Sequence, residues 1–339
     1  MNHKFPYKWN LKDGYKTKSN GLKVFGTFVC GGGSTMGYKL AGFNHLGGVE
    51  IDPKLADVYK TNHSTKYFYL QDIRKFNKRE DLPKELYNLD ILDGSPPCSS
   101  FSMAGSREKA WGKSKQFREG QAIQTLDDLV FEYVKTIKKL QPKVAILENV
   151  KGLIQGNAKA YAKRLKQEFE NAGYKVQVFL LNAASMGVPQ KRERVFFVGL
   201  RKDIKRPLLK LRFNERQITF KEIDKGLGDE LSDSFKKWWE RTQRGKSFST
   251  AHPNGSYFNS HRLCNNKVVN TIMATGGAVL GHPNHPCKIS DHSLKLAGTF
   301  PIDYNFKTVK PKYIIGMSVP PVMIAQIASK IKEQWFDYA

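Results

Sequence analysis

A cysteine stands directly after a predicted buried strand, where a thiol is able to do chemistry. Residues 90–93 form a short apolar run, and Pro96 and Pro97 then keep the backbone extended before Cys98. In open α/β sheets, substrates bind beyond the carboxyl ends of the strands, and this order of residues places the thiol there. A lone cysteine is more often buried and inert, so its neighbours decide whether Cys98 is reactive.

An acid and two arginines flank two further predicted strands. Residues 143–150 form a second apolar strand that carries Glu148 near its end. Arg192 and Arg194 precede a third strand, residues 195–200, and their spacing points both side chains the same way on an extended chain. We therefore expect a thiol, a carboxyl group and a guanidinium to converge at one edge of a sheet.

A glycine-rich turn near the N-terminus predicts a cofactor site. Residues 24–30 have the pattern of a strand, and the glycines at 31–33 separate it from a helix. The next strand, residues 47–52, carries Glu50 roughly 20 residues after the glycines, a spacing typical of a ribose-binding carboxylate. A plain tight turn is the commoner explanation for glycines alone, but together with the acid they indicate a cofactor that contains adenosine.

The charge of the chain indicates the kind of partner it binds. Its 339 residues include 56 Lys and Arg against 31 Asp and Glu, a formal net charge of +25. Such an excess favours a polyanion, above all nucleic acid. An anionic membrane surface is disfavoured, because we find neither a basic amphipathic helix nor a long apolar run. The first 21 residues lack a signal peptide, so we expect an intracellular protein.

The cysteines predict no metal site and no disulfide framework. They stand at positions 30, 98, 264 and 287, far apart and without a C-x-x-C pair. We therefore expect any role of Cys98 to be chemical.

Three motifs in this order carry a resemblance to a known family. Pro97 with Cys98, then Glu148-Asn149-Val150, then the Gln-x-Arg-x-Arg run at 190–194, resemble the cytosine-C5 DNA methyltransferase family. The resemblance covers nearly the whole chain. It implies S-adenosylmethionine as the cofactor and a cytosine in DNA as the substrate.

The alternation of strands and helices from residue 24 to residue 200 predicts an α/β fold with a parallel, doubly wound, Rossmann-like sheet. Beyond residue 200 the periodicity weakens and basic and aromatic residues become frequent. By resemblance, residues 1–200, completed by 300–339, form the catalytic and cofactor-binding domain. Residues 201–299 form a smaller target-recognition domain.

The resemblance also assigns residues to the cofactor. Phe28 corresponds to an aromatic that stacks near the adenine, Glu50 to the ribose carboxylate, and Asp72 with Ile73 to the pair that reads the adenine edge. For Asp72 alone, an ordinary helix cap is the other interpretation. The complete set of corresponding positions is Phe28, Gly32, Gly33, Glu50, Ile51, Asp72, Ile73, Pro96, Leu129 and Val319.

Two positions depart from the family pattern. Cys30 stands where the family usually has the first glycine of the cofactor loop, and Met317 stands where it usually has an asparagine. The loss of that asparagine would remove a polar contact to the cofactor.

The chemistry implied by the resemblance is covalent. Cys98 adds to carbon 6 of cytosine, which makes carbon 5 electron-rich enough to take a methyl group. Glu148 donates a proton to N3, and Arg194, with Arg192 beside it, faces the carbonyl O2 or a nearby phosphate. The cytosine must first be flipped out of the duplex. Residues 103–120, a long basic loop, are expected to close over the DNA.

These assignments imply double-stranded DNA as the partner and the cytoplasm or nucleoid of a bacterium as the location, with phage origin also open. A cognate restriction endonuclease acting on the same site is a further partner that the resemblance allows. We expect a monomer that does not bind membranes.

Three alternatives stay open. An RNA methyltransferase of the tRNA-modifying branch is disfavoured, because the Cys-Phe-Thr run of that branch is absent. An amino-group methyltransferase is disfavoured, because it would have Asn or Asp before Pro-Pro and an aromatic after it. The third alternative is a catalytically silent DNA-binding accessory protein built on the same fold.

Overall fold

The computed structural model describes residues 3–97, 128–156 and 158–338. Cys98 and the predicted DNA-closing loop at 103–120 lie outside the described residues. The chain divides into two compact units. The larger unit comprises residues 17–181, 193–211 and 327–339, and the smaller unit comprises residues 1–16, 182–192 and 212–326. This grouping differs from the predicted division at residue 200, since 182–192 and 300–326 fall in the smaller unit.

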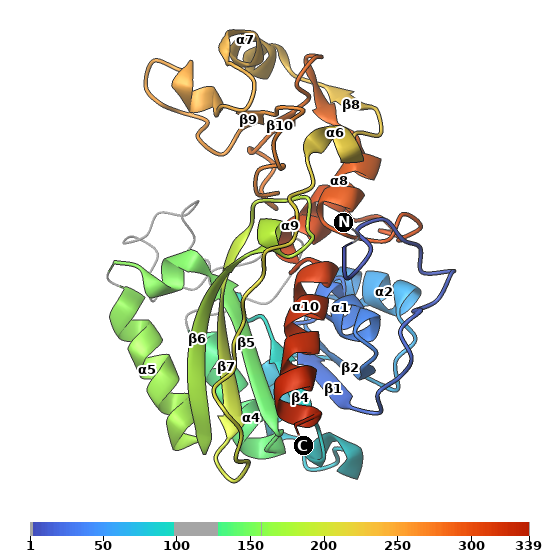
Figure 1. Cartoon of the computed structure of the whole chain (residues 1–339), viewed down its shortest axis with the longest axis vertical. Helices are drawn as coiled ribbons and strands as arrows, with labels where there is room; N and C mark the ends of the chain where they lie inside the picture. The colour runs from blue at the N-terminus through green and yellow to red at the C-terminus, as the bar shows by residue number, and fades with distance from the viewer. Residues whose placement is uncertain (1–2, 98–127, 157, 339) are drawn as a thin grey trace. The chain divides into compact units, whose positions relative to one another are not determined.

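The larger unit contains a seven-stranded sheet with the order β3-β2-β1-β4-β5-β7-β6 (Figure 1). Its strands are β1 (Lys23–Thr27), β2 (Asn44–Glu50), β3 (Tyr67–Leu70), β4 (Ile91–Gly94), β5 (Val144–Val150), β6 (Tyr174–Asn182) and β7 (Glu193–Arg201). The chain winds outward from β1 to β3 and then returns to add β4 and β5 on the other side of β1. The strand order therefore reverses between β1 and β4, and doubly wound folds bind their ligands at such a point.

Helices and short helical turns connect these strands. The helices are α1 (Gly33–Leu40), α2 (Pro53–Asn62), α3 (Ile73–Lys78), α4 (Leu129–Leu140) and α5 (Ala158–Asn171). The short turns are η1 (Lys84–Tyr87), η3 (Lys151–Ile154) and, near the C-terminus, the π-helical η6 (Lys332–Phe336). Helix α4 begins at Leu129, which is buried.

One strand departs from the predicted parallel sheet. Strands β1 to β5 pair in parallel, but β7 runs antiparallel to β5, with Val150 opposite Arg194. Only residues 183–192 join β6 to its neighbour β7, and a parallel crossover needs a dozen or more residues. The reversal places the beginning of β7 beside the end of β5.

Tyr133 of α4 ties the centre of this sheet together. Its buried hydroxyl lies 2.8 Å from the carbonyl oxygens of Leu92 and Ile146, which belong to the neighbouring strands β4 and β5. The ring also fills the space beside Gly94, where an added Cβ would come within 2.4 Å of it. The helix therefore holds the end of β4 in place.

The smaller unit has a four-stranded sheet with the order β8-β11-β10-β9 and a small aromatic core. Its strands are β8 (Leu227–Glu230), β9 (His261–Arg262), β10 (Leu280–Gly281) and β11 (Cys287–Ile289). Its helices are α6 (Phe220–Ile223), α7 (Asp233–Arg241), α8 (Asp291–Ala297) and α9 (Pro311–Met317), with the short turns η4 (Ala183–Ser185) and η5 (Phe248–Thr250). Helix α10 (Pro321–Ile331) begins in this unit and ends in the larger one.

The C-terminal helical stretch is apolar. Among the described residues, Pro311–Phe336 is the one stretch long and apolar enough to cross a membrane, and 83% of its most apolar window is buried inside the protein. Such burial is typical of a core helix.

Gly47 of β2 offers a test of the sheet's close packing. Its φ is +135°, and a Cβ at this position would lie 1.6 Å from the carbonyl oxygen of Tyr67 on β3. We predict that Gly47→Ala lowers the free energy of unfolding by about 3 kcal/mol or more, measured by urea denaturation. Gly173→Ala is the matched control, because Gly173 also has a positive φ but open space around it. Its expected loss is about 1 kcal/mol. Equal losses in the two variants would show that the contact with β3 is unimportant.

Candidate active site

The glycine loop between β1 and α1 packs closely against the imidazole of His63. Gly32 is the N-cap of α1 with φ +78°, and a Cβ there would lie 2.2 Å from Nε2 of His63. The same Nε2 lies 3.2 Å from the carbonyl oxygen of Gly31. Burial lowers the pKa of His63 to about 3, so the imidazole is neutral and its Nε2–H donates to Gly31. Only glycine fits at position 32.

Glu50 fixes the loop from the end of β2. Its Oε2 accepts a hydrogen bond from the backbone N–H of Cys30 at 2.8 Å, and its Oε1 accepts from Ile51 and Asp52 at 2.9 and 3.0 Å. Burial raises the pKa of Glu50 above its ordinary value, and these backbone donors oppose the rise. A carboxylate has about four acceptor positions, so three backbone bonds leave room for one more donor, such as a hydroxyl.

Two residues of the loop have left-handed backbone conformations. Phe28 has φ +57° and Cys30 has φ +48°, a region that favours glycine. This geometry explains why a glycine is common at the position of Cys30. Strained backbone of this kind occurs where a loop must hold one shape around a ligand.

The residues predicted to contact adenine lie at the carboxyl ends of β2 and β3. Asp72 is the N-cap of α3 and accepts from the backbone N–H of Arg74 at 2.7 Å, so the helix-cap interpretation describes its contacts. Ile73 and Leu129 are buried and Ile51 is half-buried. Their roles toward a cofactor stay predictions.

The segment that leads to Cys98 is tied on both sides. After β4, the Ser95 hydroxyl donates to the carbonyl oxygen of Phe28 at 3.3 Å. The Asn149 amide, on β5, donates to the carbonyl oxygen of Pro96 at 3.2 Å. The last described residues before the cysteine are therefore attached to the glycine loop and to the strand that carries Glu148.

Glu148 and Arg194 form an ion pair across β5 and β7. Arg194 Nε lies 2.9 Å from Glu148 Oε1, and the two side chains are only 13% and 12% exposed. Burial lowers the pKa of Arg194 below its ordinary value, and the charge of Glu148 opposes that shift. The antiparallel direction of β7 makes this pair possible, because it puts the first residues of β7 beside the last residues of β5. The first residues of a parallel strand would lie beside the first residues of β5 instead.

Arg192 has a different set of partners. Its buried guanidinium donates to the carbonyl oxygens of Ile272, Gly316 and Ser318 at 3.1, 2.8 and 2.9 Å, all within the smaller unit. These bonds fix the turn that carries Met317, which is 37% exposed, and Val319 follows as a buried residue. Arg192 therefore has a structural role, and its role toward a substrate stays a prediction.

Two buried polar residues were missed in the sequence. His63 lies under the glycine loop, as described above. Asp93, at the end of β4, is buried and accepts a hydrogen bond from the Tyr38 hydroxyl at 3.0 Å. An acid inside an otherwise apolar strand was a signal that could have identified Asp93.

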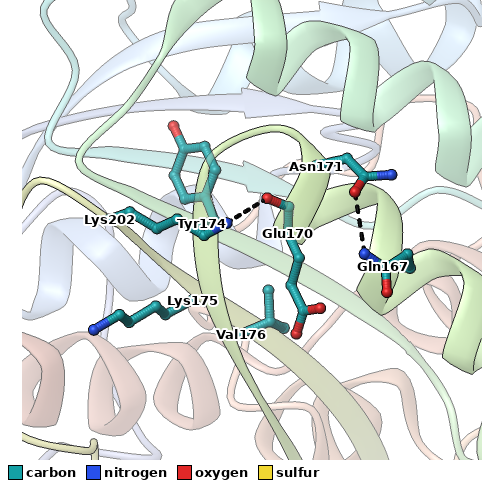
Figure 2. Close-up of a pocket in the computed structure, with 7 residues that line it drawn as sticks. All are labelled: Gln167, Glu170, Asn171, Tyr174, Lys175, Val176 and Lys202. Atoms are coloured by element: carbon teal, nitrogen blue, oxygen red, sulfur yellow. Dashed lines mark hydrogen bonds between the residues drawn. The ribbon is translucent and has the colours of Figure 1, made fainter.

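A shallow pocket on the larger unit lies elsewhere (Figure 2). Its lining residues are Gln167, Glu170, Asn171, Tyr174, Lys175, Val176 and Lys202. Lys202 Nζ donates to the carbonyl oxygen of Glu170 at 2.9 Å, so polar groups here bond one another. The pocket residue Lys202 comes directly after β7, whose residue Leu200 pairs with Val144, the first residue of β5. The pocket is therefore near the beginning of β5, whereas Glu148 is near its end.

Solved structures share this fold. A candidate DNA modification methyltransferase from a prophage of E. coli has a TM-score of 0.68, with 21% identity over 93% of this chain and 100% of that chain. The Dnmt2 methyltransferase of S. pombe has a TM-score of 0.62, with 14% identity over 92% of this chain and 98% of that one. The predicted α/β methyltransferase fold is therefore confirmed.

Curated proteins are similar in sequence. Type II methyltransferase M.NgoPII of Neisseria gonorrhoeae is 28% identical over 333 residues, 92% of this chain and 86% of that protein. Type II methyltransferase M.FnuDI of Fusobacterium nucleatum is 36% identical over 187 residues, 54% of this chain and 48% of that protein. The chain thus spans about half the length of this second relative.

The family model extends over most of the sequence. A model described as C-5 cytosine-specific DNA methylase matches residues 22–333, from the start of the first strand to the C-terminal helical stretch. The match includes the glycine loop, the Glu148–Arg194 pair and residues 182–192 and 212–326 of the smaller unit. The chain therefore belongs to the C-5 cytosine-specific DNA methylase family.

Proposed function

We propose that this protein transfers a methyl group from S-adenosylmethionine to carbon 5 of cytosine in double-stranded DNA. The observation that carries the proposal is the Glu148–Arg194 ion pair at the end of β5, beside the segment that runs from Pro96 into Cys98. An acid and a cation thus lie on the strands beside the segment that leads to the proposed nucleophile, Cys98. Family membership supports the same reaction.

The loop after β1 fits the cofactor. Gly32 leaves room for close backbone approach, and Glu50 keeps an acceptor position for a ribose hydroxyl. Phe28, Ile51 and Ile73 would provide apolar surface for the adenine. When bound, the cofactor supplies an electrophilic methyl group. In this arrangement the chain's own task is to orient the sulfonium toward the base and to keep water away.

Proton transfer is the part of the reaction that Glu148 and Arg194 would perform. Addition of the Cys98 thiolate to carbon 6 pushes electrons toward N3, and Glu148 supplies the proton there. Arg194 then stabilises the carboxylate that remains, because a cation 2.9 Å away favours the ionised form. After carbon 5 has taken the methyl group, a base would remove the proton from carbon 5, the thiolate would leave carbon 6, and the proton on N3 would return to Glu148.

A basic and aromatic face of the smaller unit is our candidate for DNA contact. Trp238 of α7 has Lys237 Nζ at 5.3 Å and the Arg241 guanidinium carbon at 5.7 Å from its ring centre. The His252 ring lies 4.5 Å from the Trp238 ring and 5.4 Å from the Tyr257 ring, centre to centre, and Phe258, the next residue, is 52% exposed. Cations bind phosphates and exposed rings stack on bases, so this face would supply energy for flipping the cytosine.

The partners follow from this function. Double-stranded DNA is the proposed substrate, recognised by the smaller unit, and the protein acts as a monomer. A cognate restriction endonuclease is a proposed partner, since several similar proteins are named Type II methyltransferases. Similar phage proteins are named orphan methyltransferases, so phage origin without such a partner stays open.

The first prediction tests the covalent step. We predict that Cys98→Ala abolishes methyl transfer to DNA but keeps DNA binding, because the thiolate supplies the bond to carbon 6 and little affinity. DNA with 5-fluorocytosine at the target should form a covalent adduct with the wild-type protein, detected by mass spectrometry at Cys98. Cys264→Ala, which removes another free thiol, is the control and should retain full activity. Methyl transfer by Cys98→Ala at near the wild-type rate would remove the mechanism.

The second prediction separates the two members of the ion pair. Glu148→Gln should lower the rate of methyl transfer by about 100-fold or more, because the amide cannot donate a proton to N3. It should also lower the free energy of unfolding by about 2 kcal/mol, since Arg194 keeps its hydrogen bond to the Glu193 carbonyl oxygen but loses its charged partner at a poorly hydrated site. Initial rates and urea denaturation measure the two effects. Glu168→Gln, in an exposed pair with Lys138, is the control and should change neither.

The third prediction concerns the basic face. The logarithm of DNA affinity should fall linearly with the logarithm of salt concentration, and Lys237→Ala or Arg241→Ala should each reduce the slope by about one. Fluorescence anisotropy at several salt concentrations measures the slope. Lys288→Ala is the control in the same unit, because Lys288 is paired with Asp229 at 2.9 Å. An unchanged slope in both test variants would place the DNA on another face.

A further inference from the structure

Asp93 is a buried carboxyl group that the proposed chemistry does not use. It is the third residue of β4 and is only 4% exposed. Four residues separate it from Cys98 in the sequence. A buried carboxyl group is costly to maintain unless its position or its charge serves a purpose.

Hydrogen bonds connect Asp93 to the helix of the cofactor loop. Its Oδ1 accepts from the Tyr38 hydroxyl at 3.0 Å, and the Ser34 hydroxyl also donates to the carboxyl group. Both donors belong to α1, and Ser34 comes directly after the glycines that begin this helix. The backbone carbonyl of Asp93 accepts from the Thr27 hydroxyl at the end of β1, at 3.2 Å. One residue thus joins β1, β4 and α1.

Among the described residues, the titratable groups that act on Asp93 from the neighbouring elements are neutral or negatively charged. They are Tyr38 of α1, Tyr133 of α4 and Glu148 of β5. Burial raises the pKa of both tyrosines well above their ordinary values, so their hydroxyls are neutral donors. Burial, with a smaller contribution from the charge of Glu148, raises the pKa of Asp93 to about 7. Its charge therefore changes near neutral pH.

We propose that Asp93 is a positioning residue for methyl transfer, which holds the first turns of α1 against the strand that leads to Cys98 and so couples cofactor binding to the placement of the thiol. The proposal rests on the function proposed above. An ionised carboxylate accepts from both hydroxyls. In a neutral carboxyl group one oxygen carries a proton and accepts less well. One of the two hydrogen bonds is therefore weaker, and the start of α1 is held less firmly.

Asp93→Asn is the central test, because asparagine keeps the shape but is uncharged and has a donor NH2 group in place of one acceptor oxygen. We expect the variant to bind S-adenosylmethionine about 5-fold more weakly by calorimetry, and its kcat to fall about 10-fold even at saturating cofactor. Tyr38→Phe, which removes one donor only, should show the same pattern to a lesser degree. The losses in the double variant should be smaller than the product of the single losses, since both residues act through one bond.

The pH dependence distinguishes positioning from simple structural support. Cofactor affinity of the wild-type protein should rise between pH 6 and pH 8 as Asp93 ionises, and the affinity of Asp93→Asn should be low at both pH values. The folding stability of the wild-type protein should instead fall as the pH rises. The folded pKa of Asp93 is raised, so stability present below its ordinary pKa of 3.8 is lost as the pH rises toward 7. Asp93→Asn should therefore show a smaller loss of thermal stability over this range.

Asp90→Asn is the matched control. Asp90 comes directly before β4 and accepts from the Lys23 backbone N–H at 2.8 Å and from Lys143 Nζ at 2.8 Å, groups that do not belong to α1. It should leave the pH dependence of cofactor affinity unchanged. A folded Asp93→Asn or Tyr38→Phe protein with wild-type affinity and kcat would overturn the proposal. If the wild-type protein binds S-adenosylmethionine but methylates no cytosine, the proposed function fails, while the affinity measurements still decide the role of Asp93.

Discussion

The antiparallel pairing of β5 with β7 is the constraint on which the candidate site depends. It places Arg194 opposite Val150 and within 2.9 Å of Glu148. An acid at a strand end is ordinary, but an acid beside a poorly hydrated guanidinium has a stabilised ionised form. In the reaction proposed above, Arg194 would stabilise the Glu148 carboxylate that remains after proton transfer to the base. The direction of β7 therefore decides whether Glu148, near the end of β5, has Arg194 beside it.

The cofactor loop depends on a second physical principle, the satisfaction of buried polar groups. Glu50 is buried, yet three backbone N–H groups compensate its lost hydration. His63 Nε2 lies 3.2 Å from the carbonyl oxygen of Gly31 in the same loop. These contacts hold Phe28 and Cys30 in left-handed conformations, which cost energy in isolation. The loop is thus shaped before any ligand arrives, which reduces the ordering cost of binding.

Arg192 illustrates how similar sequence positions obtain different roles. Arg192 and Arg194 are two residues apart on an extended chain, and the spacing alone suggests equivalent side chains. The Arg192 guanidinium instead satisfies three backbone carbonyls around residues 272 and 316–318. A five-donor planar group suits a cluster of carbonyl oxygens as well as it suits a phosphate. The smaller unit uses that property to fix the turn before α10.

The sequence by itself determined the fold class, the family and the order of the motifs, because these depend on local patterns: apolar strands, a glycine turn and acids at strand ends. It also indicated a polyanionic partner, since net charge requires no geometry. Only the tertiary structure decided the direction of β7, the carbonyl partners of Arg192 and the burial of Asp93 against Tyr38. Each of these depends on contacts between segments far apart in the chain. A periodic pattern reports that a strand is buried, but hydrogen bonds between strands, and the space left for a connection, set its direction and its partners.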